Sequence, residues 1–76
     1  MMTEEQHVLI ELTHDEALVF FEWLAKHDGS LPVEDPAEQQ VLWRIEASLE
    51  RVLVDPLSPD YQAVLAAARK RVRGEE

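Results

Sequence analysis

The sequence predicts a mainly α-helical domain, with a short N-terminal strand followed by a three-helix antiparallel bundle. Apolar residues recur every three or four positions in three segments, each segment starts with a capping signal, and only one short stretch alternates with a period of two. The 76 residues amount to one domain. A chain this short buries only about 60% of its unfolded surface, so we expect tight helix packing or oligomerisation to add to its stability.

The N-terminal stretch has the pattern of a short strand. Residues 1–5 are polar, and we expect them to be frayed. Residues 6–12 alternate between two sides and contain β-branched residues, which favours a strand. One side carries Val8, Ile10 and Leu12, and the other carries His7, Leu9 and Glu11. The strand can lie on the helices, pair with residues 30–33, where Pro32 cannot donate, or pair with the same strand of a second copy.

The first helix is predicted over residues 14–28. Thr13 and Glu16 form the two halves of a capping box, and Gly29 supplies the stop. The expected core side consists of Ala17, Leu18, Phe21, Leu24 and Ala25. Further apolar residues lie outside this side, namely Val19, Phe20 and Trp23. Such a helix is either sandwiched in the bundle or covered in part by another chain.

The second helix is predicted over residues 36–54 and has the clearest pattern in the chain. Asp35 acts as N-cap, Pro36 fits the first helical position, and Glu38 completes a second capping box. The expected core stripe consists of Leu42, Ile45, Leu49 and Val52. Asp55 precedes a proline, which ends the helix. We therefore expect this helix to be the centre of the bundle.

The third helix is predicted over residues 59–73. Ser58 serves as its cap, Pro59 fits the first position, and Gly74 ends it. The expected inward face consists of Tyr61, Val64, Leu65, Ala68 and Val72.

The charge of the chain is strongly negative. Seven Lys and Arg residues against 16 Asp and Glu residues give a net charge of −9. Residues 1–68 hold three cations against fourteen acids, or −11, so the body is acidic and the C-terminal tip is basic. This surface repels phosphate backbones, and it either attracts a basic partner or serves solubility alone. The chain has no Cys and no apolar run that spans a membrane, so we expect a cytoplasmic protein.

The sequence predicts no catalytic residue, no cofactor and no metal site. His7, His14 and His27 do not have the helical spacing of metal ligands. Glu46 and Glu50 lie four apart and are expected to form a solvated face. A metal-binding protein or an enzyme is therefore the third hypothesis.

The apolar residues outside the core stripes are the candidate interface. These candidates are Val19, Trp23, Gln39, Trp43, Glu46, Ala47 and Glu50. Either other parts of the chain cover both tryptophans, or Trp23 and Trp43 anchor a partner inside an acidic rim. The second alternative predicts a non-enzymatic interaction module, a homodimer that acts as a regulator, an adaptor or an immunity- or antitoxin-like blocker of a basic target.

A ribbon-helix-helix-like DNA-binding regulator is the alternative function, because a strand precedes two helices. The outward side of the strand, His7, Leu9 and Glu11, offers no basic side chain to phosphates. Nucleic acid is therefore disfavoured as a partner.

Three segments carry a resemblance to known proteins. The segments LTHDEALVFFEWL, AEQQVLWRIEASLE and PDYQAVLAAAR resemble those of a group of small acidic helical bacterial proteins with no assigned activity. The likeness covers residues 9–73. It implies a bacterial cytosolic protein with the same helical layout, and it carries no site residue over to this chain.

Overall fold

Three α-helices make up most of the chain, which confirms the predicted mainly helical class. The computed structural model describes residues 6–75. The elements are α1 (His14–Lys26), α2 (Pro36–Val52), a 3₁₀ turn η1 (Asp55–Leu57) and α3 (Tyr61–Arg73). Each helix is two residues shorter at one end than the sequence pattern predicts. The expected fraying of residues 1–5 lies outside the described residues.

The start of α1 has the predicted capping box. The backbone N–H of Glu16 donates to Thr13 Oγ1 at 3.1 Å, and the backbone N–H of Thr13 donates to Glu16 Oε1 at 2.8 Å. Two backbone donors that α1 cannot satisfy internally are thereby paired.

The start of α2 differs from the predicted box. Asp35 is the N-cap, but its Oδ1 accepts from the nearer backbone N–H of Ala37 at 2.8 Å. Glu38 reaches past the cap and accepts from the backbone N–H of Glu34 at 3.3 Å. The two side chains therefore cap separate donors and form no reciprocal box.

The connection between α2 and α3 contains a turn that the sequence pattern did not predict. Leu53 leaves α2 in an extended conformation, and Asp55–Leu57 form η1. As a result α3 starts later than expected, with Asp60 rather than Ser58 at the N-cap, and Ser58 Oγ donates to the Asp60 carboxylate. At the other end Gly74 adopts φ +83°, the left-handed conformation that a helix stop requires.

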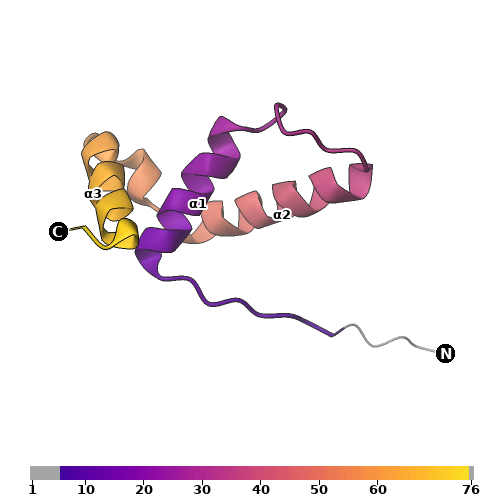
Figure 1. Cartoon of the computed structure of the whole chain (residues 1–76), viewed down its shortest axis with the longest axis horizontal. Helices are drawn as coiled ribbons and strands as arrows, with labels where there is room; N and C mark the ends of the chain where they lie inside the picture. The colour runs from indigo at the N-terminus through magenta and orange to yellow at the C-terminus, as the bar shows by residue number, and fades with distance from the viewer. Residues whose placement is uncertain (1–5, 76) are drawn as a thin grey trace.

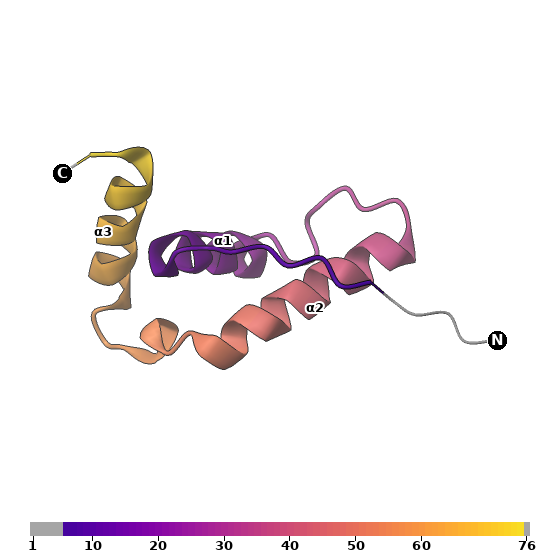
Figure 2. The same ribbon diagram turned by 90° about the horizontal axis from the view of Figure 1, so that it is seen from below.

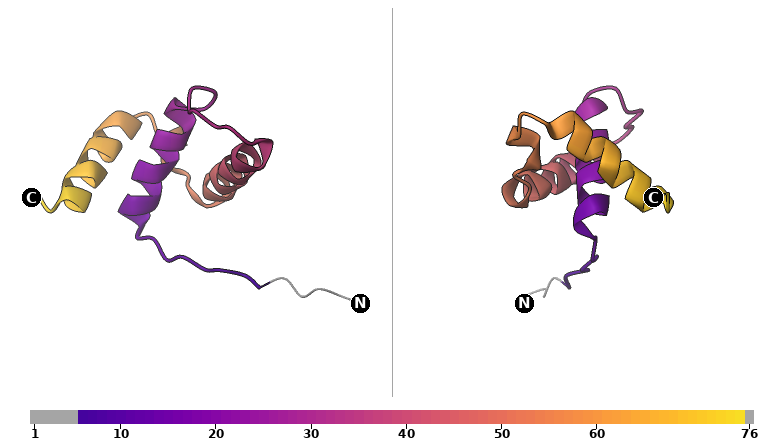
Figure 3. Two further views of the ribbon diagram at one scale, coloured as in Figure 1. Left: turned by 45° about the vertical axis from the view of Figure 1, so that its right-hand side comes forward. Right: turned by 90° about the vertical axis from the view of Figure 1, so that its left-hand side faces the viewer.

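The helix α1 lies between the other two helices (Figure 1, Figure 2). Its contacts extend to both α2 and α3, whereas α2 and α3 share no extensive contact with each other. α3 runs beside α1 in the opposite direction: Arg71 near its end binds Asp15, and Tyr61 at its start donates to Glu22 Oε1 at 2.8 Å. The predicted three-helix bundle is therefore open on the side where α2 and α3 diverge (Figure 3).

The core forms around α1, and the prediction that α2 is the central helix is wrong. The buried cluster consists of Leu18, Phe21, Leu53, Leu65 and Ala68. α2 contains no buried residue, and only its C-cap, Leu53, enters the cluster. Val52, one of the predicted core residues, is 71% exposed. The apolar side chains of α2 do share one face of the helix. The helix α1 covers only part of this face, because α2 has a neighbour on one side alone.

The predicted strand over residues 6–12 is wrong for the single chain. These residues form no strand in the part of the chain that the structure describes, and they run away from the lower end of α1 (Figure 1). The expected mate, residues 30–33, lies in the loop at the opposite end of α1 and closes a turn of its own through the Val33 N–H and the Leu31 carbonyl, 2.8 Å apart. Within the described residues, the arm and residues 30–33 therefore lie at opposite ends of α1 and do not pair. We call residues 6–12 the arm.

Candidate interaction surfaces

Trp43 lies at an open hollow between the start of α2 and the loop that precedes it. The hollow has a volume of about 430 Å³, and its apolar lining includes Leu31, Val33 and Pro36 beside the indole. Trp43 is 53% exposed, and its Nε1–H donates to Asp28 Oδ1 at 3.0 Å. This hydrogen bond fixes one edge of the ring and leaves much of the rest open to a partner.

The rim of this hollow is acidic. Glu34 and Asp35 line it, and no Lys or Arg is among its lining residues. Partial burial raises the pKa of the nearby Glu46 carboxyl, and the negative charges of Asp28 and Glu50 raise it further. Negative charge is therefore concentrated around Trp43 without a compensating cation in the hollow. We call Trp43, Asp28, Glu34, Asp35 and Glu46 the acidic Trp face.

Trp23 lies near the same end of α1. Its ring centroid is 4.9 Å from that of His27 and 6.4 Å from that of Phe20, and the indole is 43% exposed. His27 Nδ1 lies 2.9 Å from the Trp23 carbonyl oxygen. Because Asp28 follows directly after His27, one turn at the end of α1 contacts both tryptophans. The chain itself covers neither tryptophan fully.

The seven candidate interface residues have different positions. The acidic Trp face includes Trp43 and Glu46, and Gln39 lines its hollow. Ala47 and Glu50 are exposed on α2. Val19, by contrast, is partly buried and packs against the buried cluster.

Sequence reasoning missed the part of the face that comes from the loop. Asp28, Leu31, Val33 and Glu34 lie outside the helices, so no helical period includes them. The available signal was the position of Asp28 directly before Gly29, in the turn that follows α1.

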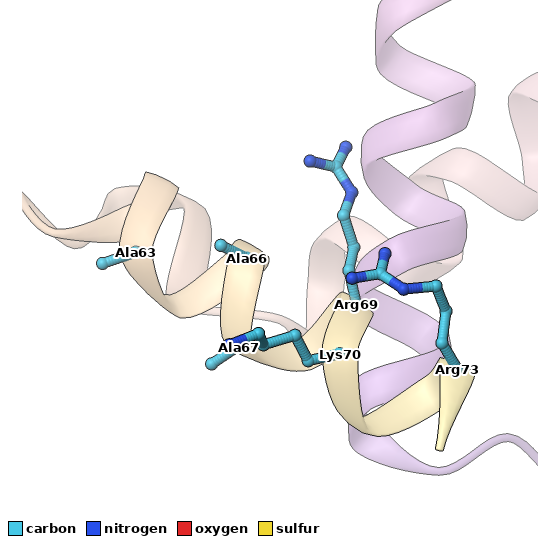
Figure 4. Close-up of a pocket in the computed structure, with 6 residues that line it drawn as sticks. All are labelled: Ala63, Ala66, Ala67, Arg69, Lys70 and Arg73. Atoms are coloured by element: carbon cyan, nitrogen blue, oxygen red, sulfur yellow. The ribbon is translucent and has the colours of Figure 1, made fainter. Parts of the chain in front are cut away.

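A basic flank on α3 is the second open surface. It lines a hollow of about 470 Å³ and consists of Ala63, Ala66, Ala67, Arg69, Lys70 and Arg73. No other helix covers the alanines, and the guanidinium groups of Arg69 and Arg73 project on the same side (Figure 4). This end of the molecule has the opposite charge to the acidic Trp face.

The arm is the third open surface and the most apolar one. Val8 is 85% exposed, Leu9 91% and Ile10 79%. Within the described chain, no hydrogen bond involves the backbone of residues 6–12. Unpaired backbone groups together with exposed apolar side chains are the features of a strand without a partner.

The remaining polar contacts tie the helix ends together. His14 Nε2 lies 3.0 Å from Asp55 Oδ1, so His14 pairs across to η1. Among the described residues, no three His, Asp or Glu side chains lie close enough to hold a metal ion. None of the described helices has the length and apolar character needed to cross a membrane.

Comparisons with family models, curated proteins and solved structures found no match to this chain. The proposals below therefore rest on the residues and contacts described above.

Proposed function

We propose that this protein is a non-enzymatic interaction module, a homodimer that binds a basic protein segment through the acidic Trp face. The observation that carries the proposal is the half-exposed indole of Trp43, held by Asp28 in an apolar hollow with an acidic rim. Trp is the residue type most enriched at binding hot spots, and an acidic rim steers cationic partners to it.

The chemistry of the face favours an arginine side chain as the ligand. A guanidinium group stacks on an indole and is attracted by its π-electrons, while its fork of N–H donors fits a carboxylate. The face offers Trp43 for stacking, with Asp28, Glu34 and Glu46 around it as acceptors. The apolar walls of Leu31 and Val33 suit the aliphatic part of the same side chain.

The surface of the chain supports the homodimer. The arm and α2 both carry exposed apolar side chains: Val8, Leu9 and Ile10 are 79–91% exposed, and Val41 and Val52 are 56% and 71% exposed. A stable dimer buries about 800 Å² per partner, and exposed apolar surface is what such an interface buries.

A peptide titration tests the acidic Trp face. In the Trp23→Phe variant, emission reports on Trp43 alone because the chain has two Trp residues. We expect a hexa-arginine peptide to change this emission saturably, with weaker binding at higher salt. Hexa-glutamate is expected to have no effect.

Two variants that each remove one negative charge separate the effect of the acidic Trp face on peptide binding from the effect of the net charge. Asp28→Asn keeps an oxygen that accepts from the Trp43 indole but removes the charge, and we expect it to weaken peptide binding ~2- to 5-fold, as an exposed ion pair does. Glu75→Gln removes the same charge beside Arg73, at the other end of the chain, and is expected to bind as the parent does. Equal weakening by both variants, or no change in emission, would overturn the proposed face.

A further inference from the structure

We propose that the homodimer forms through the arm, with residues 6–12 of two copies paired as antiparallel strands around a two-fold axis at Leu9. This inference rests on the dimeric state proposed above and names its interface. The arm has the extended trace, the unpaired backbone and the exposed apolar side chains of a strand that lacks a mate (Figure 1). Among residues 6–75, which the structure describes, no segment pairs with the arm.

Complementarity between an acidic and a basic side chain identifies the occupant as a second copy in one register. When the axis passes through Leu9, Leu9 faces its own copy, and His7 of each arm faces Glu11 of the other on the same side of the ribbon. Each of the two cross-strand pairs then places a Glu carboxylate, which accepts hydrogen bonds, beside an imidazole that carries an N–H donor. An axis at Ile10 instead sets each Glu11 carboxylate opposite a Leu9 side chain.

The other side of the ribbon forms an apolar face in the same register. Val8 of each arm then lies opposite Ile10 of the other, which brings together four side chains that are 79–85% exposed in the single chain. An axis at Ile10 would keep these side chains on the same side but would set Ile10 opposite its own copy and Val8 opposite Leu12.

The ribbon also needs support, because an isolated two-stranded ribbon is only marginally stable. The base of the arm supplies it. Leu12 is 41% exposed, less than Val8, Leu9 or Ile10, because it lies next to the start of α1. Val72 lines a hollow beside Thr13, where the arm meets α1, and is 47% exposed. These side chains offer an apolar seat for the ribbon at the point where both arms join their helices.

Disulfide formation between single introduced cysteines can locate the two-fold axis, because the chain has no Cys of its own. Directly opposite Cβ atoms in a strand pair lie about 4.5–5.5 Å apart, and diagonal neighbours about 7–8 Å, too far for an unstrained disulfide. We therefore expect Leu9→Cys to form a covalent dimer under air oxidation much faster than Val8→Cys or Ile10→Cys. Its rate should be independent of protein concentration once the dimer is populated.

Leu57→Cys is the matched control, since Leu57 is 86% exposed but lies on η1. Its oxidation depends on collision, so doubling the protein concentration should double the rate per molecule. If Leu9→Cys behaves in the same way, or if Ile10→Cys is fastest, the proposed pairing is overturned.

A second pair of variants tests the contact without oxidation. Leu9→Lys sets two cations face to face in the pair and should shift the protein from twice 8.8 kDa to 8.8 kDa in sedimentation. Leu57→Lys should remain a dimer, and the helical circular dichroism of both should be unchanged because both side chains are exposed in the single chain. A dimer that survives Leu9→Lys contradicts the arm pairing and leaves the dimeric state intact. A monomeric wild-type protein contradicts both proposals.

Discussion

Replacing Leu18 by alanine tests the conclusion that α1, and not α2, carries the core. Leu18 is 0% exposed and belongs to the cluster that joins α1 to α3 and to the end of α2. Leu-to-Ala changes at such sites cost about 2–5 kcal/mol through lost transfer free energy and the remaining cavity. We expect a loss of about 3 kcal/mol. A domain of this size has only about 4–11 kcal/mol of total stability, so the loss is a large share of it.

Urea denaturation followed by circular dichroism measures this loss. With a slope of about 1 kcal/mol per molar for a small protein, the midpoint should fall by about 3 M. Every variant is compared at one protein concentration, because dimerisation makes stability depend on concentration. Leu57→Ala removes the same atoms from a side chain that is 86% exposed, and we expect it to stay within about 0.5 kcal/mol of wild type.

Leu42→Ala provides the decisive comparison with α2. Leu42 is the first residue of the stripe that the sequence pattern assigns to the core, and it is only half-buried. Its replacement should therefore cost less than that of Leu18. If Leu42→Ala costs more than Leu18→Ala, α2 is the central helix and the packing described above is refuted.

Three further predictions concern contacts between elements. Burial, with the hydrogen bond to Glu22, raises the pKa of Tyr61 from 10.0 to about 12. Folding therefore favours the neutral phenol. The stability of wild type relative to Tyr61→Phe should be constant below pH 10.0 and fall towards pH 12. Hydrogen bonds from Arg71 lower the pKa of Asp15 below 3.8. The ionised carboxylate therefore stabilises the fold above pH 3.8, and this stabilisation fades as the pH falls. NMR titration of Arg71→Gln should show the Asp15 pKa rising towards 3.8. Thr13→Ala should lower the free energy of unfolding by about 1 kcal/mol in urea denaturation, because the capping box is lost.

Specific outcomes contradict each of these three. A stability difference between wild type and Tyr61→Phe that stays constant up to pH 12 contradicts the first. An Asp15 pKa that is the same in wild type and Arg71→Gln contradicts the second. Thr13→Ser keeps the hydroxyl, so equal losses in Thr13→Ser and Thr13→Ala contradict the third.

Local signals predicted the helix boundaries well because they act within a few residues. Thr13 and Glu16 cap α1 as expected, and Gly74 stops α3 through its left-handed conformation. The predictions failed where two neighbouring residues could both serve as the cap. Ser58 and Asp60 both suit an N-cap, and the chain uses Asp60 because η1 takes up the residues before it.

The interaction surfaces were predictable only in part. The sequence indicated that Trp43 and Glu46 lie away from the core stripe of α2, which follows from the helical period. The contact of Trp43 with Asp28 joins positions 15 residues apart across a loop, and no periodicity encodes it. Val19 is partly buried against the core cluster, and the helical period alone did not place it there.

The sequence by itself determined the helical class, the helix caps and the acidic character of the surface, since these depend on neighbouring residues and on composition. Tertiary structure alone decided which helix became the core. α1 and α2 both carry apolar stripes, but α1 has neighbours on two sides and buries Leu18, Phe21 and Leu24, whereas α2 has one neighbour and buries none of its residues. The burial of a helix depends on how many other elements pack against it. The apolar pattern along that helix does not reveal how many there are.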